Sequence, residues 1–392
     1  MPGPLEGIRI VELAQMIAVP GATHLLATQG ATSIKVEGVE RGDDLRAYGS
    51  QKGGMGGWFV NANGGKRSIG LNLQSDAGKA VMWQLLDEAD VFIQGFRPGA
   101  VERLGFGPEE ALRRNPKLVY VSSSGFGSSG PYADQPVYDP VIQALSGWAG
   151  AQATDDGPTL IRGMVADKVA ALTASQAITA ALVSRGRTGV GQHVEMSMLE
   201  ANIAFNWPDV MMHCTVLDDD ATHVPNLLGH YQLFRASDGS VSVTAGNDAQ
   251  WQAVCAALDR PDLAVDERFA NAASRNGNFR AWYGAFGEMC SAFTTEELLR
   301  RCRDADVPAV PALDPADVAA DEQVVARDAV PVVQHPVVGA VRMPRQGARF
   351  ESDGETALSP APLHGQHTDE ILGELGHDTA TITALRSDGV VG

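Results

Sequence analysis

One aspartate, Asp167, combines a reactive side chain with surroundings that favour its chemistry. It stands near the start of the segment 163–184, GMVADKVAALTASQAITAALVS, in which 169–182 carries no charged residue. A helix of this composition is apolar nearly all the way round, so we expect it to be buried inside a large domain. A carboxylate at the mouth of such a helix would be ionised, poorly hydrated and fixed in direction, which is what a carboxylate nucleophile needs.

The same position also suits a purely structural role. Aspartate is a favoured N-cap residue, because its side chain accepts hydrogen bonds from the free N–H groups of the first helical turn. Capping and catalysis are compatible in one carboxylate. Both interpretations of Asp167 therefore stay open at this point.

Composition limits the classes of protein that this chain can be. With 392 residues, 44% of them hydrophobic, it can bury a large core and form two domains. A net charge of -18 argues against a nucleic-acid partner, because counterion release needs clustered basic residues. All lysines precede residue 169, which predicts that an anionic ligand is held by the first half. Random substitution in a chain that prefers arginine to lysine explains this uneven distribution of lysines equally well.

The cysteines and the N-terminus indicate a reduced, cytoplasmic protein. The cysteines are widely spaced and form no CxxC pair, so neither a zinc site nor a disulfide framework is expected; they are Cys214, Cys255, Cys290 and Cys302. No basic region followed by an apolar core opens the chain, and no uncharged apolar run reaches about 18 residues. We expect neither export nor membrane association.

Alternating elements must position Asp167. β-branched runs at 8–13 and 33–37 flank a helical stretch at 21–29, which predicts a β-α-β unit with parallel strands and a right-handed crossover. The alternation continues with a helix opened by Ser75 and buried strands at 90–94 and 118–122. It predicts a doubly wound, Rossmann-like α/β sheet. However, no GxGxxG follows the first strand, and the segment 65–68, GKRS, lacks the ending of a phosphate loop, so neither a dinucleotide site nor a nucleotide triphosphate site is expected.

A change of composition at 217–229 predicts a domain boundary. The segment 231–246 then reads as a hairpin that turns at Ser237-Asp238-Gly239. Helices near 250–257, 280–293 and 295–304 follow, and after them come short strands within 330–350 and a final helix at 368–385. We therefore expect a large domain from 1–225, a small α+β domain from 226–325, and a return of 326–392 to the large domain.

Several motifs occur in order along the whole chain, among them NGGKRSIGLNL, GFRPGAVERLGFG, PVYDPVIQALSG, GMVADKVAALTASQAI, GRTGVGQHVEMSMLEA and HTDEILGELG. Together they strongly resemble the family III (CaiB/BaiF) CoA-transferases, which include formyl-CoA and carnitine CoA-transferases. The resemblance implies a Rossmann-like large domain, a smaller domain and an interlocked homodimer.

The resemblance also implies roles for individual residues. The aspartate that matches Asp167 is the nucleophile in such enzymes and carries an aspartyl-CoA thioester, with an acyl-CoA and a carboxylic acid as substrates and no metal. The turn 245–248 is the candidate to close over the site. The positions that match the CoA-lining residues are Leu71, Asn72, Gly95, Phe96, Arg97, Arg103, Val137 and Tyr138. Arg97 and Arg103 suit phosphate because a guanidinium carries a permanent charge and a fork of donors.

The chain departs from the family pattern at two places near this site. Ile17 stands where formyl-CoA transferase has glutamine, which argues against a formyl or oxalyl group and favours a larger acyl group. Gly38 stands where a phosphate-contacting arginine is expected, and Arg41 is the candidate to replace it.

Two alternatives remain. An α-methylacyl-CoA racemase shares the fold and the aspartate but needs two acid/base groups, and its His-Asp pair falls at Tyr138-Asp139 here. The chain has no histidine between His24 and His193, which disfavours racemisation. The other alternative is an inactive CoA-binding homologue, against which the retention of Asp167 argues.

Overall fold

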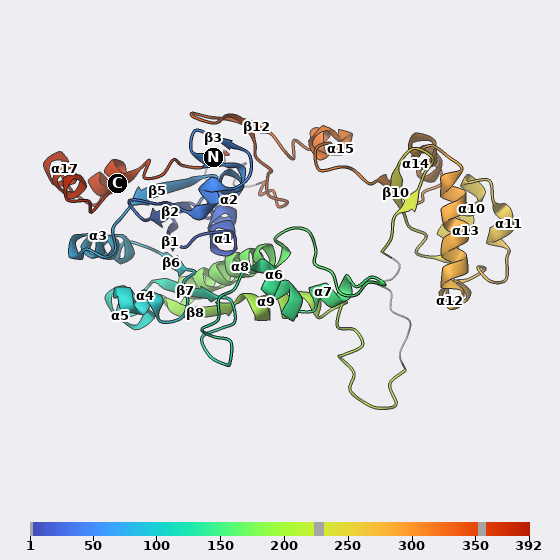
Figure 1. The fold of residues 1–392 in the computed structure, drawn as a ribbon, viewed down its shortest axis with the longest axis horizontal. Helices are drawn as coiled ribbons and strands as arrows, with labels where there is room; N and C mark the ends of the chain where they lie inside the picture. The colour runs from blue at the N-terminus through green and yellow to red at the C-terminus, as the bar shows by residue number, and fades with distance from the viewer. Residues whose placement is uncertain (1–2, 223–230, 352–357) are drawn as a thin grey trace. The chain divides into compact units, whose positions relative to one another are not determined.

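The computed structural model describes residues 3–222, 231–351 and 358–392. The chain forms two compact units, one made of Met1–Thr215 with Asp328–Gly392 and the other of Val216–Arg327 (Figure 1). The boundary predicted between residues 225 and 226 lies outside the described residues. Each unit has its own hydrophobic core and is considered by itself.

The larger unit is organised around a six-stranded sheet of order β5-β2-β1-β6-β7-β8, in which every pairing is parallel. The strands are β1 (Arg9–Leu13), β2 (Thr32–Glu37), β5 (Lys66–Gly70), β6 (Val91–Gln94), β7 (Val119–Ser124) and β8 (Gln192–Ser197). In a doubly wound sheet of this order the connections reverse between β1 and β6, and ligands bind at the carboxyl ends of the strands there. The predicted α/β sheet is confirmed.

Both faces of this sheet are covered, as a parallel sheet requires. Neighbouring residues of β1 pack on opposite faces of the sheet, because side chains alternate along a strand. Ile10 packs under α1 (Ala18–Ala27) and α8 (Val165–Thr188). Val11 packs on the other face, against α3 (Asp76–Asp87) and α16 (Thr368–Glu374). The hydrophobic core therefore lies on both sides of the sheet.

Shorter elements complete the larger unit. The helices are α2 (Gly57–Asn63), α4 (Ala100–Leu104), α5 (Pro108–Arg114), α6 (Asp139–Leu145), α7 (Trp148–Ala151), α9 (Met198–Asn206) and α17 (Thr379–Ser387), with a 3-10 turn η1 (Asp44–Ala47). The hairpins pair β3 (Gln51–Lys52) with β4 (Met55–Gly56) and β12 (Val332–His335) with β13 (Gly339–Arg342). The single helix predicted at 368–385 is wrong: Gly376, at φ +90°, separates α16 from α17.

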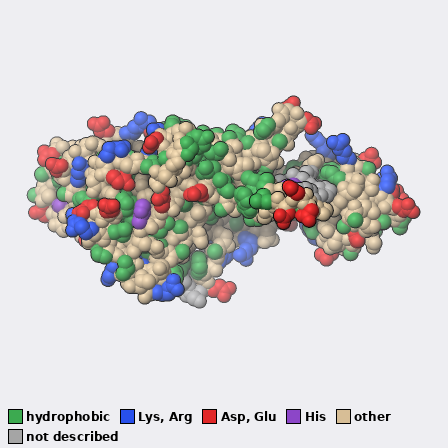
Figure 2. All heavy atoms as spheres, turned by 90° about the horizontal axis from the view of Figure 1, so that it is seen from below, with side chains coloured by type: hydrophobic (Ala, Val, Ile, Leu, Met, Phe, Trp, Pro, Cys, Tyr) green, Lys and Arg blue, Asp and Glu red, His purple; other side chains and the backbone are tan. Residues whose placement is uncertain are grey.

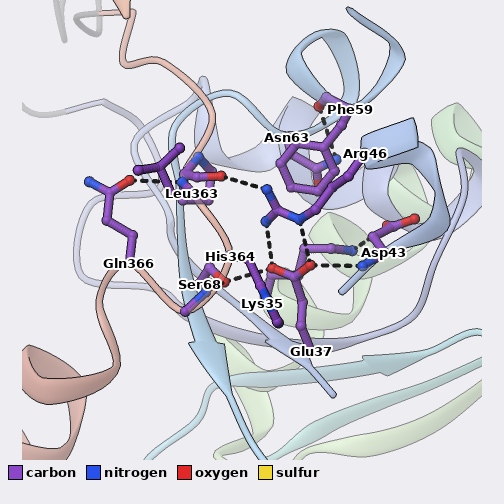
Figure 3. Close-up of polar contacts among 12 residues, drawn as sticks. Lys35, Glu37, Asp43, Arg46, Phe59, Asn63, Ser68, Leu363, His364 and Gln366 are labelled. Carbon is purple, nitrogen blue, oxygen red and sulfur yellow. Dashed lines mark hydrogen bonds and ion pairs between the residues drawn. The ribbon is translucent and has the colours of Figure 1, made fainter. Parts of the chain in front are cut away.

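Polar contacts fasten the returning C-terminal segment to β2 and β5 (Figure 3). The His364 Nε2 atom lies 2.8 Å from the carbonyl oxygen of Gly38. The backbone N–H of Gly365 donates to Ser68 Oγ at 2.9 Å, and Arg46 donates to the carbonyl of Pro362 at 3.1 Å. The segment thus fills the space beside the edge strand β5.

The long helix α8 is only partly covered by its own chain. Ala170, Ala174 and Ile178 are buried against the sheet, whereas Leu172 is 55% exposed and Val183 is 60% exposed. The expectation of burial all round is therefore wrong for the single chain. Composition indicates that an apolar face will be covered, but it does not say whether the same chain covers it.

The smaller unit packs helices on a three-stranded antiparallel sheet of order β11-β10-β9. Its strands are β9 (Phe234–Arg235), β10 (Ser240–Val243) and β11 (Ala309–Pro311). Its helices are α10 (Asp248–Ala257), α11 (Pro261–Ala264), α12 (Ala272–Gly277), α13 (Phe279–Ser291), α14 (Thr295–Asp304), η3 (Val318–Ala320) and α15 (Glu322–Ala326). The predicted hairpin with its turn at 237–239 is confirmed.

All cysteines are free thiols, with Cys255, Cys290 and Cys302 buried and Cys214 exposed. Within the described parts of the chain, no helix is both long and apolar enough to cross a membrane. The same residues contain no group of three or more histidine, cysteine or acidic side chains that could hold a metal ion.

Candidate active site

Asp167 lies inside the first turn of α8 and does not cap it. The helix begins at Val165, and its N-cap residue is Met164, which makes no side-chain capping bond. The N-cap interpretation of Asp167 is therefore wrong. A neighbouring carboxylate supplies the cap instead, since Asp139 Oδ2 accepts the backbone N–H of Asp167 at 2.9 Å. The side chain of Asp167 is thereby left free for other contacts.

The carboxylate of Asp167 is buried without a hydrogen-bond donor. The residue is 9% exposed, and no described residue donates a hydrogen bond to its carboxylate oxygens. Burial, and then the nearby charge of Asp139, raise the pKa of Asp167 to about 7. The carboxylate expected to be ionised therefore has a pKa close to neutral pH. A buried carboxyl group with such a pKa is typical of a functional site.

Two amide side chains hold the surroundings of Asp167 in place. Gln143 donates to Asp139 Oδ1 at 2.6 Å and to the carbonyl of Gly163 at 3.0 Å. Asn202, from α9, donates to the carbonyl of Ala166 at 3.1 Å. Helices α6 and α9 therefore fix the first turn of α8 from outside it.

The first turns of α1 and α8 lie close together. An ideal Cβ placed on Gly21 would stand only 3.0 Å from the Cβ of Ala171, so the missing side chain lets the two helices approach. Gly21 lies one turn after Ile17, and Ala171 lies one turn after Asp167. Both helices start at the carboxyl edge of the sheet. Ile17, which immediately precedes α1, therefore lies on the side of Asp167 that faces α1.

Three of the predicted CoA-lining residues follow β6 at the same edge. A Cβ on Gly95 would stand 3.1 Å from Val19 and 3.2 Å from Ala14, so a side chain at this position would press on both neighbours. Phe96 is 37% exposed, and its backbone N–H donates to Gln94 Oε1 at 2.8 Å. The structure therefore brings Gly95 and Phe96 against the loop that follows β1, at the switch point of the sheet.

The predicted phosphate-binding arginines lie on one short segment after β6, Arg97 in the loop and Arg103 in α4. Arg97 and Arg103 are both exposed, and neither forms an ion pair with an acidic residue in the described ranges. Arg103 folds back so that its Nη1 atom would lie 3.0 Å from a Cβ on Gly99. The two guanidinium groups are thus carried by the same β6–α4 segment.

The other predicted residues are more dispersed. Leu71 is 2% exposed in the core beside β5, so only its backbone could face a ligand. Asn72 accepts a hydrogen bond from the N–H of Gln74. Val137 packs on Gly125 after β7, and the adjacent Tyr138 is 67% exposed. Strand β2 separates β5 from β1, so Leu71 and Asn72 lie farther along the edge than Gly95.

The proposed replacement for the missing arginine occupies a different environment. Arg41 is exposed and forms an ion pair with Asp44 at 2.7 Å. The carbonyl of Gly38 lies against His364. The role suggested for Arg41 therefore stays a prediction.

A buried charge network was missed by sequence reasoning. Lys35 contacts Glu12 at 2.7 Å and Asp43 at 2.8 Å, and Lys66 contacts the second oxygen of Glu12 at 2.7 Å. All four side chains are 0% exposed. The expectation that the lysines attract an anionic ligand is therefore wrong for Lys35 and Lys66. No signal in the sequence could pair residues on three different strands and a loop.

This network fixes the loop between β1 and α1. Lys35 donates to the carbonyl of Ala14 at 2.9 Å, and Lys66 donates to that of Pro20 at 2.8 Å. Asp43 accepts the N–H of Met16 at 3.2 Å, and Met16 holds the left-handed φ of +69°. Buried ions thus set the backbone immediately before Ile17.

A second ionic cluster adjoins the first (Figure 3). Glu37 accepts hydrogen bonds from Arg46, from Ser68 and from the backbone of Asp43. Arg46 also lies over the ring of Phe59, 3.6 Å from its centre. Burial opposes the charge of Glu37, but the bonded Arg46 outweighs it and keeps the pKa of Glu37 below its usual value.

Comparisons with known proteins agree with this architecture. Residues 5–368 match the family model described as CoA-transferase family III. The chain is 35% identical over 335 residues to the acetyl-CoA:oxalate CoA-transferase of Acetobacter aceti, covering 83% of this chain and 85% of that protein. It is 30% identical over 394 residues to the human succinyl-CoA:glutarate CoA-transferase, covering 99% and 90%. A crystal structure of a CAIB/BAIF family protein from Brucella suis superimposes with a TM-score of 0.83 at 32% identity, covering 96% of this chain and 100% of that one.

The chain therefore belongs to CoA-transferase family III, and the resemblance drawn from its motifs is confirmed. It is an enzyme of the acyl-CoA:carboxylate CoA-transferase type.

Proposed function

We propose that this enzyme moves CoA from an acyl-CoA to a carboxylic acid through a thioester on Asp167. The observation that carries the proposal is the buried carboxylate of Asp167, which has no donor among the described residues and a pKa near neutrality. Such a group is ionised in part, poorly hydrated and held by its helix. Those properties suit a nucleophile that must attack a thioester carbonyl.

The steps balance without any further reagent. The Asp167 carboxylate attacks the donor thioester carbonyl, and the departing CoA thiolate leaves a mixed anhydride on the side chain. The thiolate then attacks the aspartyl carbonyl, forming the aspartyl-CoA thioester and releasing the first carboxylate. The acceptor carboxylate attacks that thioester to form a new anhydride, and CoA thiolate takes the acceptor acyl group and restores Asp167. Each step is an acyl transfer at one fixed group.

Mass spectrometry tests this proposal directly. The enzyme is incubated with a pool of acyl-CoAs, digested and searched for an adduct of the mass of CoA. We expect the adduct on one peptide, the one that contains Asp167. An adduct on a cysteine-containing peptide instead, or none with any donor, would contradict the covalent route.

We propose that CoA lies at the switch-point edge, with its phosphates on Arg97 and Arg103. Changing either arginine to alanine should weaken CoA binding by about 1.5–3 kcal/mol, the usual range for a charged hydrogen bond. Calorimetric titration with CoA measures this loss. A pantetheine thioester, which lacks the nucleotide, should bind each variant as well as it binds the wild type.

The control for this prediction is Arg113→Ala. Arg113 is an exposed arginine of α5 that pairs with Glu110 at 2.6 Å, and its loss should leave CoA binding unchanged. Equal weakening for CoA and for the pantetheine thioester would mean that Arg97 and Arg103 act on the fold.

We expect Asp139 to set the pH range of the reaction. Ionised Asp167 is the attacking species, so kcat/KM should rise with pH through about 7. Asp139 is the charged neighbour that raises the pKa of Asp167, after burial itself. Asp139→Asn should therefore lower that pKa and shift the acid limb of the pH–rate profile to lower pH, by up to about one unit.

The exposed Asp155 provides the matched control, because Asp155→Asn removes a charge from a loop outside this contact. Its profile should overlie that of the wild type. An acid limb that stays in place in Asp139→Asn would show that burial alone sets the pKa.

The acceptor and donor are proposed as classes. Two of the relatives are named for oxalate and for glutarate. In this chain the apolar Ile17 beside the nucleophile candidate favours an acyl group larger than formyl or oxalyl. We expect turnover to improve with longer apolar donors, measured as CoA exchange across an acyl-CoA series.

We also propose that the enzyme is an interlocked homodimer located in the cytoplasm. The support for a dimer is the outer face of α8, where Leu172 and Val183 are exposed, and the groove beside it, which is lined by Leu26, Ser175, Thr179 and Arg187. Apolar side chains also gather on the face drawn in Figure 2. A folded, active monomer in light scattering at high dilution would contradict the dimer.

A further inference from the structure

The smaller unit contains a cavity of its own, of about 270 Å³. It opens between the strand pair β9–β10 and helices α12 and α13. Its lining consists of Phe234, Val243, Thr244, Ala245, Gly246, Ala272, Arg275, Asn276, Trp282, Tyr283 and Phe286. All of these described residues belong to the unit Val216–Arg327.

One wall of the cavity is aromatic. The ring of Phe234 stacks on Tyr283 and also contacts Phe286, with 4.5 Å between ring centres in each case. Trp282 packs on Phe286 at 5.7 Å. Rings that brace one another in this way form a rigid apolar surface, which suits a flat or branched apolar group.

A buried hydroxyl adjoins this wall. The Tyr283 oxygen is buried and has no hydrogen-bond partner among the described residues. Its burial, and then the nearby Cys290, raise the pKa of Tyr283 to about 12, so it stays a neutral O–H donor. A buried donor without an acceptor costs free energy that a bound oxygen atom would recover.

Arg275 supplies a cation at the cavity. The residue is only 4% exposed. It donates to the carbonyl of Phe269 at 3.1 Å and to Asp248 at 2.7 Å, while the Asp248 side chain is 49% exposed. A guanidinium has five N–H donors, and these two bonds leave donors over for a ligand. The planar fork of an arginine matches the geometry of a carboxylate group, with which it can form two parallel hydrogen bonds.

We propose that this cavity binds a carboxylic acid with a compact aromatic or branched apolar body. The carboxylate would pair with Arg275, and the body would lie against Phe234, Trp282 and Phe286. A volume of about 270 Å³ is small for a ligand site, which limits the acid to roughly ten non-hydrogen atoms. The inference concerns the smaller unit alone and does not depend on the chemistry proposed for Asp167.

Calorimetric titration of the full-length enzyme with phenylacetate, in the absence of CoA, tests the inference. We expect saturable binding with a Kd of about 1 mM, the order that a ligand of this size reaches. The neutral analogue phenylacetamide should bind at least about tenfold more weakly, because it cannot pair with the guanidinium charge. Arg275→Gln should weaken phenylacetate binding by a similar factor.

A second variant keeps the test decisive if loss of Arg275 disturbs the fold. Ala272→Leu fills the cavity from its exposed rim and keeps Arg275, so it should abolish binding. Ala273→Leu changes the neighbouring exposed alanine of α12, which does not line the cavity, and should bind like the wild type. Asp167→Asn should also bind like the wild type. The absence of saturable binding, or binding that Ala272→Leu leaves intact, would overturn the inference.

Discussion

Replacing Asp167 by asparagine should reduce CoA transfer by about 10⁴-fold or more, the scale of losing a covalent nucleophile. The amide keeps the shape of the side chain but can form neither the anhydride nor the thioester. Steady-state exchange of CoA between a donor and an acceptor measures the loss. Two trapping reactions should fail in the variant as well: reduction of the thioester by borohydride, and inactivation by hydroxylamine after acyl-CoA is added.

The fold should survive this change. The pKa of Asp167 is raised in the folded state, so the folded protein loses stability relative to the unfolded chain as the pH rises from 3.8 to about 7. The asparagine variant carries no charge to bury. It should therefore melt at a higher temperature than the wild type at pH 8, when both are scanned at one protein concentration. A lower melting temperature would instead assign Asp167 a structural role.

Lys168→Ala is the matched control, because Lys168 is the next residue of α8 and is exposed. It should retain transfer. The racemase alternative makes the opposite prediction for the wild type: it would wash deuterium from solvent into the α-carbon of a branched acyl-CoA without any acceptor. Rapid deuterium uptake of that kind, with no CoA adduct on Asp167, would reassign the aspartate to acid/base chemistry.

Glu12→Gln should destabilise the larger unit by about 3–5 kcal/mol, the cost of removing one partner from a buried ion pair. Glu12 contacts both Lys35 and Lys66 at 2.7 Å, and all of these side chains are 0% exposed. Its loss leaves two buried lysines with Asp43 as the remaining carboxylate of the network. Urea unfolding of wild type and variant at equal concentration measures the difference.

Acid unfolding provides a second measure of the same network. Burial opposes the charge of Glu12, but Lys35 and Lys66 outweigh it and lower its pKa from 4.5 to about 2. The stability that this carboxylate contributes is present above pH 4.5 and is lost as the pH falls from 4.5 to about 2. The glutamine variant should lack this part of the pH dependence.

Two further variants make the result specific. Glu110→Gln breaks an exposed pair with Arg113 and should change the stability very little. The double variant Glu12→Gln with Lys66→Met restores the balance of buried charge, so it should recover part of the loss. If Glu12→Gln has the same free energy of unfolding as Glu110→Gln, the buried charge network contributes little to stability.

Several strands of the larger unit could be predicted from local pattern, whereas β5 (Lys66–Gly70) was not predicted. Alternating β-branched runs and helical spacing indicated strands at 8–13, 33–37, 90–94 and 118–122, each of which overlaps an observed strand. The parallel order of the sheet followed from the short βα connections, which allow few topologies. Asp167 could also be chosen from sequence as the candidate nucleophile, because a lone carboxylate before an uncharged helical run is a local feature.

The surroundings of Asp167 could not be predicted in the same way. Its cap comes from Asp139, which lies 28 residues earlier, and its raised pKa arises from burial together with that second carboxylate. The capping preference and helical pattern of the sequence contain no sign of this raised pKa. Helical propensity and capping preference describe a residue and its near neighbours, and neither contains the charge of a side chain on another helix.

Residue types at short spacing were therefore enough to predict the class of the chain, several of its strands and the carboxylate proposed as the nucleophile. Only the tertiary structure decided which charges are paired and which face is left uncovered. Lys35 and Lys66 looked like ligand-binding cations until the fold placed Glu12 between them. The helix α8 looked fully buried until the sheet covered one side of it and left Leu172 exposed. Burial and electrostatic coupling depend on distances between residues that are remote in the sequence, and those distances exist only once the chain has folded.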